Sequence, residues 1–194
     1  MTQPHHAPKT IAALYVEPDT VYRRYNWIDC YDEARDAQTY ADTMPVIAHP
    51  PCRTWSRLRA FTTAPTGEHQ LALHALAIVR TRGGVLEHPA SSSLWKLEGM
   101  PRPGEYDRHG GYLFTVDQGA FNHPAQKRTT FYIVGAKPTE LPAFGVWSQH
   151  TRTVQSQHSR DRLKTPPAMA HWLVELVNII AFNRHHHTTK EKSQ

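Results

Sequence analysis

The sequence has few cysteines and no long apolar run. Its two cysteines, Cys30 and Cys52, are too few to build a fold on disulfides. The longest apolar-rich stretch, Trp172–Phe182, contains Glu175 and is much shorter than the roughly 20 apolar residues of a membrane-spanning helix. No apolar signal region follows the first residues. We therefore expect a cytoplasmic protein with no membrane partner.

Size and charge narrow the class of protein further. A chain of 194 residues with 39% hydrophobic residues fits one domain with a buried core, which excludes disorder along the whole chain. The 22 Lys+Arg exceed the 17 Asp+Glu and give a net charge of +5, which suits a polyanionic partner such as DNA or a nucleotide. We expect residues 1–9 to be disordered, 10–183 to form the domain and 184–194 to be a flexible tail.

Short apolar runs alternate with helical patterns along the chain. The runs predict five strands, at Ile11–Val16, Trp27–Tyr31, Pro45–Ala48, Gly84–Leu86 and Thr130–Val134. The helical patterns predict three helices, at Glu33–Tyr40, Glu68–Arg82 and Pro167–Phe182. This alternation predicts an α/β sandwich with a mostly parallel sheet, in which ligands bind beyond the carboxyl ends of the strands.

Chemically distinctive residues stand at three of these strand ends. The strand Pro45–Ala48 runs into His49-Pro50-Pro51-Cys52, and Gly84–Leu86 runs into Glu87-His88-Pro89. Gln126-Lys127-Arg128 precedes the strand Thr130–Val134. In a parallel sheet the first two groups share one edge, where a rigid Pro-Pro turn would hold Cys52 outward as a nucleophile is held.

These segments resemble motifs of the cytosine-5 DNA methyltransferases, in the family's order. His49-Pro50-Pro51-Cys52, followed by Trp55-Ser56, resembles their Pro-Pro-Cys motif, and Leu86–Pro89 resembles their Glu-Asn-Val motif. The segments Phe121–Arg128 and Arg162–Pro167 are similar to their Gln-X-Arg-X-Arg and Leu-Thr-Pro motifs. The chain also resembles small uncharacterised phage and prophage proteins with the HPPC and LEHP motifs.

The resemblance implies a fold, a cofactor and a set of site residues. The fold would be a Rossmann-like, methyltransferase-type three-layer sandwich, truncated relative to full-length enzymes, and the cofactor S-adenosylmethionine. The catalytic residues would be Cys52 as nucleophile, Glu87 as acid and Arg128 as orienting cation. The cofactor-binding residues would be Val16, Glu17, Asp29, Asp32 and Pro50. The substrate-binding residues would be His49, Pro51, Arg53, Trp55, His88 and Gln126.

Cys52 and Glu87 suit the chemistry of a pyrimidine. Carbon 5 of the ring becomes nucleophilic once a thiolate adds to carbon 6, and a carboxylic acid beside nitrogen 3 stabilises the electron-rich intermediate. A protonated Glu87 suits cytosine, whose nitrogen 3 is an acceptor, whereas uracil and thymine carry an N–H there and suit an amide acceptor. A cysteine thiol is mostly protonated at neutral pH, so Arg53, Arg128 or His49 would have to lower its pKa.

The sequence departs from the family pattern after its first strand. Residues 17–22 contain no glycine where the family has a Gly-rich cofactor loop, and the interval between Gly135 and Arg162 leaves no room for a long target-recognition segment. We therefore expect a substrate that is a single strand, a flipped base or a nucleotide. One alternative is a non-catalytic DNA-binding or phage counter-defence protein. Another is a metal-dependent hydrolase that uses His49, Cys52, His88 and His123.

Overall fold

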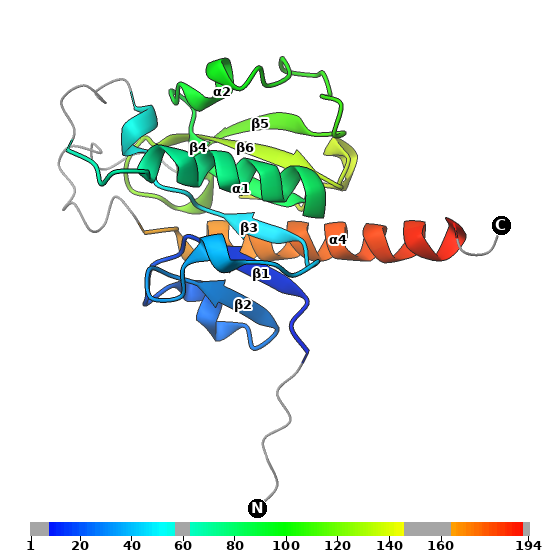
Figure 1. The fold of residues 1–194 in the computed structure, drawn as a ribbon. Coiled ribbons are helices and arrows are strands. Elements are labelled where there is room, and N and C mark those ends of the chain that lie inside the picture. Colours follow the sequence, from blue (N-terminus) through cyan, green and yellow to red (C-terminus); the bar gives the residue numbers. More distant parts are fainter. Residues whose placement is uncertain (1–7, 57–62, 146–163, 192–194) are drawn as a thin grey trace, which may run out of the picture.

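The computed structural model describes residues 8–56, 63–145 and 164–191, and its centre is a six-stranded sheet (Figure 1). The strands are β1 (Ile11–Leu14), β2 (Ile28–Tyr31), β3 (Val46–Ala48), β4 (Gly84–Pro89), β5 (Tyr112–Asp117) and β6 (Arg128–Val134). Their order is β2-β1-β3-β4-β6-β5. β2, β1, β3 and β4 are parallel, whereas β6 is antiparallel to both of its neighbours. β6 is thus the one reversed strand of this sheet, which confirms the predicted α/β class and mostly parallel sheet.

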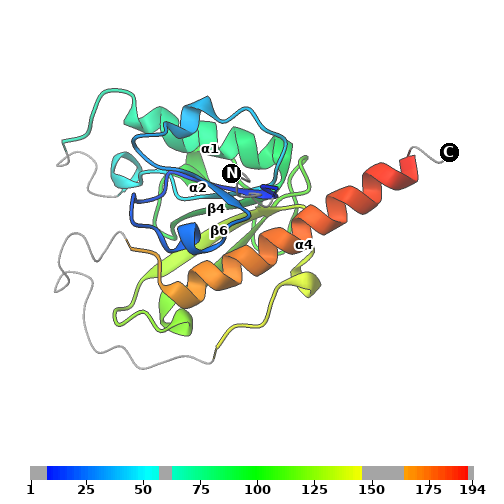
Figure 2. The same ribbon diagram turned by 90° about the horizontal axis from the view of Figure 1, so that it is seen from below.

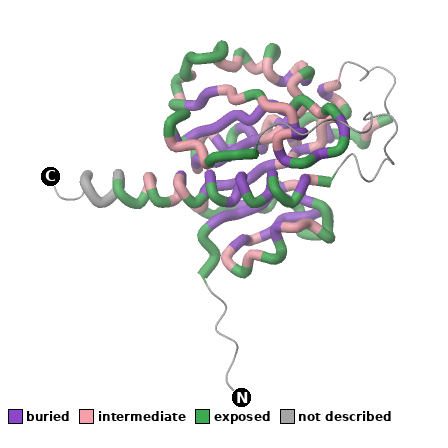
Figure 3. Tube along the Cα trace, turned by 180° about the vertical axis from the view of Figure 1, so that it is seen from behind, coloured by how far each residue is buried: buried purple, intermediate pink, exposed green. Residues whose placement is uncertain are grey.

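Two helices cover opposite faces of the sheet. Figure 2 shows α1 (Glu68–Arg82) on one side of the strands and α4 (Pro167–Glu191) on the other. Side chains alternate along the strands, so Ala12 and Leu14 of β1 pack with α1 while Ile11 and Ala13 pack with α4. The core is therefore two apolar layers, and Figure 3 shows buried strands between outward faces that are largely exposed.

The remaining elements are short. The helix α2 (Leu94–Leu97) has four residues, and 3-10 turns form at Val21–Arg24, Ala37–Thr39, Arg53–Trp55, Gln118–Phe121 and Pro138–Glu140. None of the helices in the described part of the chain has the length and apolar character needed to cross a membrane.

The structure differs from the predicted elements mainly in one helix that is absent, one strand that was missed and one helix that is longer. The helix expected at Glu33–Tyr40 is wrong, because only Ala37–Thr39 form a turn, capped by Asp36, whose carboxylate accepts a hydrogen bond from the Gln38 amide at 2.9 Å. The edge strand β5 was missed. The helix α4 continues past Phe182 to Glu191, so residues 184–191 are helical rather than a tail, and its end projects past the sheet (Figure 1). Of the other predicted segments, 1–7, 192–194 and Arg162-Leu163 lie outside the described residues.

The topology gathers five chain segments at one edge of the sheet. The carboxyl ends of β1, β3 and β4 meet there because these strands are parallel, and β6 begins there because it is reversed. The first turn of α4 reaches the same edge. The chain order reverses between β1 and β3, which is the switch point where open α/β sheets bind ligands.

Candidate active site

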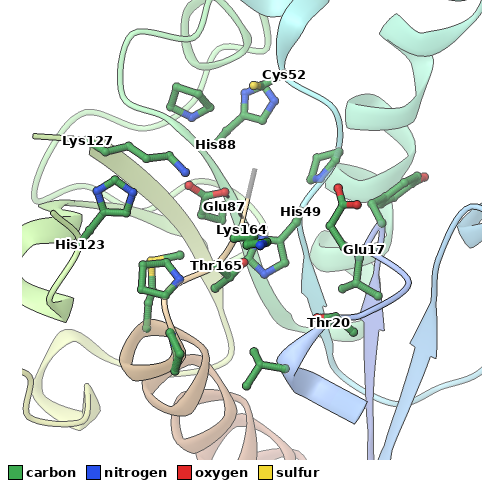
Figure 4. Close-up of a pocket in the computed structure, with 18 of the residues that line it drawn as sticks. Glu17, Thr20, His49, Cys52, Glu87, His88, His123, Lys127, Lys164 and Thr165 are labelled. Carbon is green, nitrogen blue, oxygen red and sulfur yellow. Dashed lines mark hydrogen bonds and ion pairs between the residues drawn. The ribbon is translucent and has the colours of Figure 1, made fainter. Parts of the chain in front are cut away.

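A cavity of about 830 Å³ opens at this edge of the sheet. Its lining residues come from segments 15–24, 49–53, 87–89, 122–127 and 164–169. In Figure 4, Glu87 and His49 lie between Lys127 and His123 on one side and Glu17 and Thr20 on the other. The cavity has the size of a small-ligand site, and it contains both Cys52 and Glu87.

The turn after β3 places Cys52 at the cavity. The His49 amide donates to the Leu14 carbonyl at 3.0 Å, which ties this turn to the end of β1, and the two prolines then fix the chain direction. Cys52 is half-buried and begins the 3-10 turn Arg53–Trp55. Burial raises the pKa of the Cys52 thiol, the charge of Glu87 raises it further, and Lys127 opposes the shift. The ligand-free site therefore holds a thiol and not a thiolate at neutral pH.

Glu87 is surrounded by hydrogen-bond donors. Its Oε1 accepts from the Thr129 hydroxyl and from Gln118 Nε2, the latter at 3.4 Å. Its Oε2 lies 3.5 Å from His49 Nδ1. Burial pushes the pKa of Glu87 upward, but His49, Lys127 and the Thr129 hydroxyl lower it to about 2. The ligand-free site thus holds an ionised Glu87, whereas the sequence argument expected a protonated one.

Tyr22 is a site residue that the sequence did not indicate. It is fully buried under the cavity, and its hydroxyl lies 2.9 Å from His49 Nε2. Burial and the charge of Glu87 raise the pKa of Tyr22 well above its usual value, so the phenol keeps its proton. No motif marks Tyr22, because it reaches the site from the turn between β1 and β2.

Lys127 lines the cavity, whereas its neighbour Arg128, which was predicted as the orienting cation, does not. Gln126 and Arg128 are both exposed and lie outside the lining. Arg128 is the first residue of β6 and pairs in register with Asp117. Its position in the strand therefore sets the direction of its side chain, and neighbouring residues of a strand point to opposite faces. Lys164 and Thr165 line the cavity from the approach to α4, as Figure 4 shows, and they too were missed.

Two of the residues predicted to bind substrate are used by the fold. Trp55 is 1% exposed, stacks on His69 with ring centroids 3.8 Å apart, and does not line the cavity. Its side chain belongs to the core. Arg53 lines the cavity but pairs with the buried carboxylate of Glu68 at 2.7 Å, at the start of α1. Three other residues that were predicted to bind substrate do line the cavity: His49, Pro51 and His88.

The candidate cofactor residues separate into two groups. Val16, Glu17 and Pro50 line the cavity. Asp29 and Asp32 do not, because Asp29 binds Arg35 through both oxygens, at 2.5 and 2.9 Å, and Asp32 binds Arg23 at 2.5 Å. These two carboxylates hold the chain around β2.

Tyr15 makes the turn after β1 without a glycine. Its φ of 58° lies in the left-handed region that glycine favours. Its hydroxyl makes a 2.8 Å hydrogen bond with His74 Nδ1 of α1, and Tyr15 itself lines the cavity. The backbone conformation that a Gly-rich loop would supply is thus present at Tyr15, held by the contact with α1.

The histidines at the cavity are engaged with the chain. His88 Nδ1 lies 2.8 Å from Ser92 Oγ, and His123 Nδ1 lies 2.7 Å from the Ala125 carbonyl oxygen and 3.1 Å from the Ala125 amide nitrogen. Among residues 8–56, 63–145 and 164–191, no group of three or more His, Cys, Asp or Glu side chains could hold a metal ion. The ligand set imagined for a hydrolase, His49, Cys52, His88 and His123, is therefore not formed as a metal centre.

No protein-family model and no curated protein matches the chain.

Proposed function

We propose that the protein binds a pyrimidine base in this cavity and modifies carbon 5 of the ring, with cytosine in DNA or in a nucleotide as the substrate. In this proposal the α/β sandwich is a compact methyltransferase-type domain. The observation that carries it is that Cys52 and Glu87, from two separate strand ends, line one cavity. A nucleophile and a group that faces a ring nitrogen are the pair that this chemistry needs.

The reaction would begin with a bond between Cys52 Sγ and carbon 6 of the ring. The electron pair of the 5,6 double bond moves toward nitrogen 3, where a proton held by Glu87 neutralises the developing charge. Carbon 5 would then attack an electrophilic methyl group, whose bond to the donor breaks with its electron pair leaving on the donor. A base would remove the hydrogen from carbon 5, the re-formed 5,6 double bond would expel the sulfur from carbon 6, and the proton on nitrogen 3 would return to Glu87. Lys127 would support the first step, because its charge lowers the pKa of the Cys52 thiol.

The residues at the other side of the cavity suit a donor with hydroxyl groups. Glu17 and Thr20 offer acceptors there, beside the left-handed turn at Tyr15. S-adenosylmethionine would supply the electrophilic methyl group, with Glu17 and Thr20 binding its ribose hydroxyls. Asp29 and Asp32 have no part in this assignment, because they are paired with arginines away from the cavity.

A covalent trap tests the function directly. An oligonucleotide that contains 5-fluoro-2′-deoxycytidine, incubated with the protein and S-adenosylmethionine, should form a covalent adduct, because fluorine at carbon 5 blocks the final elimination. The adduct should be lost in Cys52→Ser and retained in Cys30→Ser, which removes the other, buried thiol in β2. An adduct of equal yield in wild type and Cys52→Ser would reject the catalytic assignment.

A non-catalytic nucleic-acid-binding protein is the second candidate, which would fit a phage counter-defence role. The raised pKa of Cys52 favours it, because the thiol is not activated in the ligand-free site. This candidate predicts salt-dependent binding of single-stranded DNA that survives the double substitution Cys52→Ala with Glu87→Ala. The proposed enzyme instead predicts that the double variant loses affinity for the pyrimidine.

A further inference from the structure

A chain of hydrogen bonds runs from the core to the cavity. It begins at the hydroxyl of Tyr22, which is fully buried, passes through the ring of His49 and ends at Glu87. The rings of Tyr22 and His49 also stack, with centroids 5.7 Å apart and planes 29° apart. Only 12% of the His49 side chain and 15% of the Glu87 side chain is exposed, so the chain lies largely apart from water.

Tyr22 decides which nitrogen of His49 carries the proton. We assign the Tyr22 hydroxyl as the donor to His49 Nε2, because a fully buried O–H that keeps its proton and finds no acceptor would be costly. His49 then carries a proton on Nδ1, which faces Glu87 Oε2 at 3.5 Å. His49 therefore presents a donor to the carboxylate of Glu87.

Other neighbours of Glu87 also present hydrogen-bond donors to its carboxylate. The Thr129 hydroxyl and the Gln118 amide also donate to the carboxylate. The titratable groups that interact with Glu87 come from β4, from the segments after β1 and β3 and from the start of β6: Tyr22, His49, Cys52, His88 and Lys127. Lys164 lines the same cavity from α4.

We propose that Tyr22 and His49 are positioning residues that hold Glu87 as an ionised acceptor, so that the cavity binds a pyrimidine through a ring N–H and binds cytosine only together with a proton. The inference rests on the proposed pyrimidine site. A uracil ring already carries the hydrogen on nitrogen 3 and binds without a proton. Cytosine has no hydrogen on nitrogen 3. The complex therefore takes up one proton from solvent, which forms the hydrogen bond between Glu87 and nitrogen 3.

The first experiment measures Glu87 without any ligand. Carbon-13 NMR of protein labelled at the glutamate carboxyl follows the ionisation of Glu87, assigned by the signal that Glu87→Gln removes. We expect the midpoint to lie well below that of an ordinary glutamate in wild type and to rise in His49→Leu, because burial is then less opposed. His49→Asn, whose amide can replace Nδ1–H, should restore the low midpoint.

Tyr22→Phe tests the inner end of the chain with little change in packing. We expect it to move the Glu87 midpoint upward, less than His49→Leu does. Tyr25→Phe is the matched control, because it removes another tyrosine–histidine contact, 3.3 Å from the Tyr25 hydroxyl to His171, that lies outside the cavity. It should leave the midpoint unchanged.

The second experiment measures selectivity by calorimetry with 2′-deoxycytidine and 2′-deoxyuridine 5′-monophosphates. In wild type, the affinity for the cytidine nucleotide relative to the uridine nucleotide should fall about tenfold for each pH unit between pH 5 and 8, as uptake of one proton requires. At a fixed pH, His49→Leu should shift this ratio toward the cytidine nucleotide by about tenfold or more.

The outcomes separate the inference from the proposed function. A merely structural role for Tyr22 and His49 would weaken both nucleotides together and leave their ratio and its pH dependence unchanged, which would overturn the inference. A Glu87 midpoint that His49→Leu leaves unchanged would overturn it as well, and so would the absence of binding by either nucleotide. A failed covalent trap with an intact, pH-dependent ratio would reject the enzyme and retain the inference.

Discussion

Burial and the neighbouring charge of Glu87 together raise the pKa of the Cys52 thiol, because the two side chains line the same cavity. In the ligand-free site the negative charge of Glu87 therefore disfavours the thiolate form of Cys52, which the proposed chemistry needs. A ligand that brings a proton to Glu87 removes the carboxylate charge and favours the Cys52 thiolate. In the proposed enzyme, substrate binding and activation of Cys52 would be linked in this way.

The rate of thiol alkylation should report this opposition. In a Cys30→Ser background, Glu87→Gln should make Cys52 react severalfold faster with iodoacetamide at pH 7, because the charge that disfavours the thiolate is gone. Lys127→Met should make it react more slowly, because Lys127 lowers the thiol pKa. Mass spectrometry of samples quenched at successive times measures both rates. Rates that change in the same direction in the two variants would contradict the account.

Acid should destabilise the protein partly through Glu87. The pKa of Glu87 is lowered from 4.5 to about 2, so its contribution to stability is present above pH 4.5 and is lost as the pH falls toward 2. Between pH 6 and pH 3 this amounts to about 2 kcal/mol of the free energy of unfolding. Urea unfolding at the two pH values should show a loss smaller by this amount in Glu87→Gln. An equal loss in both proteins would contradict the lowered pKa.

The contact between β3 and β4 depends on a glycine. Gly84 has a φ of 126°, and a Cβ atom there would overlap the backbone of Val46, the first residue of β3, with which Gly84 pairs. Gly84→Ala should therefore cost more than about 3 kcal/mol or prevent folding. Gly110→Ala is the matched control, because its φ is 70° but nothing lies within 4 Å of the added atom. It should cost only about 1 kcal/mol by thermal or urea unfolding.

Local patterns predicted the strands that are buried on both faces and the helix α1, whose bounds are those expected. They missed β5, although most of its six residues, Tyr112–Asp117, are of types that favour strands. They failed at Glu33–Tyr40 because Asp36 caps a short turn there, and the chain then extends toward β3.

Sequence motifs predicted residues of the cavity lining only where the motif also lies at the end of a strand. Cys52 and Glu87 come together because β3 and β4 are parallel neighbours, which the alternation of elements already indicated. Tyr22 meets His49 across 27 residues through the turn between β1 and β2, and no spacing in the sequence shows this contact. Trp55 was predicted at the cavity but packs in the core, and Lys127 lines the cavity but was not predicted. Packing and strand direction decide which of several neighbouring residues faces the cavity, and the sequence alone does not show either.

A crystal structure of the protein with a pyrimidine nucleotide tests the central claim most directly. The account predicts one ring in the cavity, with carbon 6 about 3.5 Å from Cys52 Sγ and nitrogen 3 within hydrogen-bonding distance of Glu87. Density for the ring elsewhere on the surface, or a ring that meets only one of these two side chains, would contradict it.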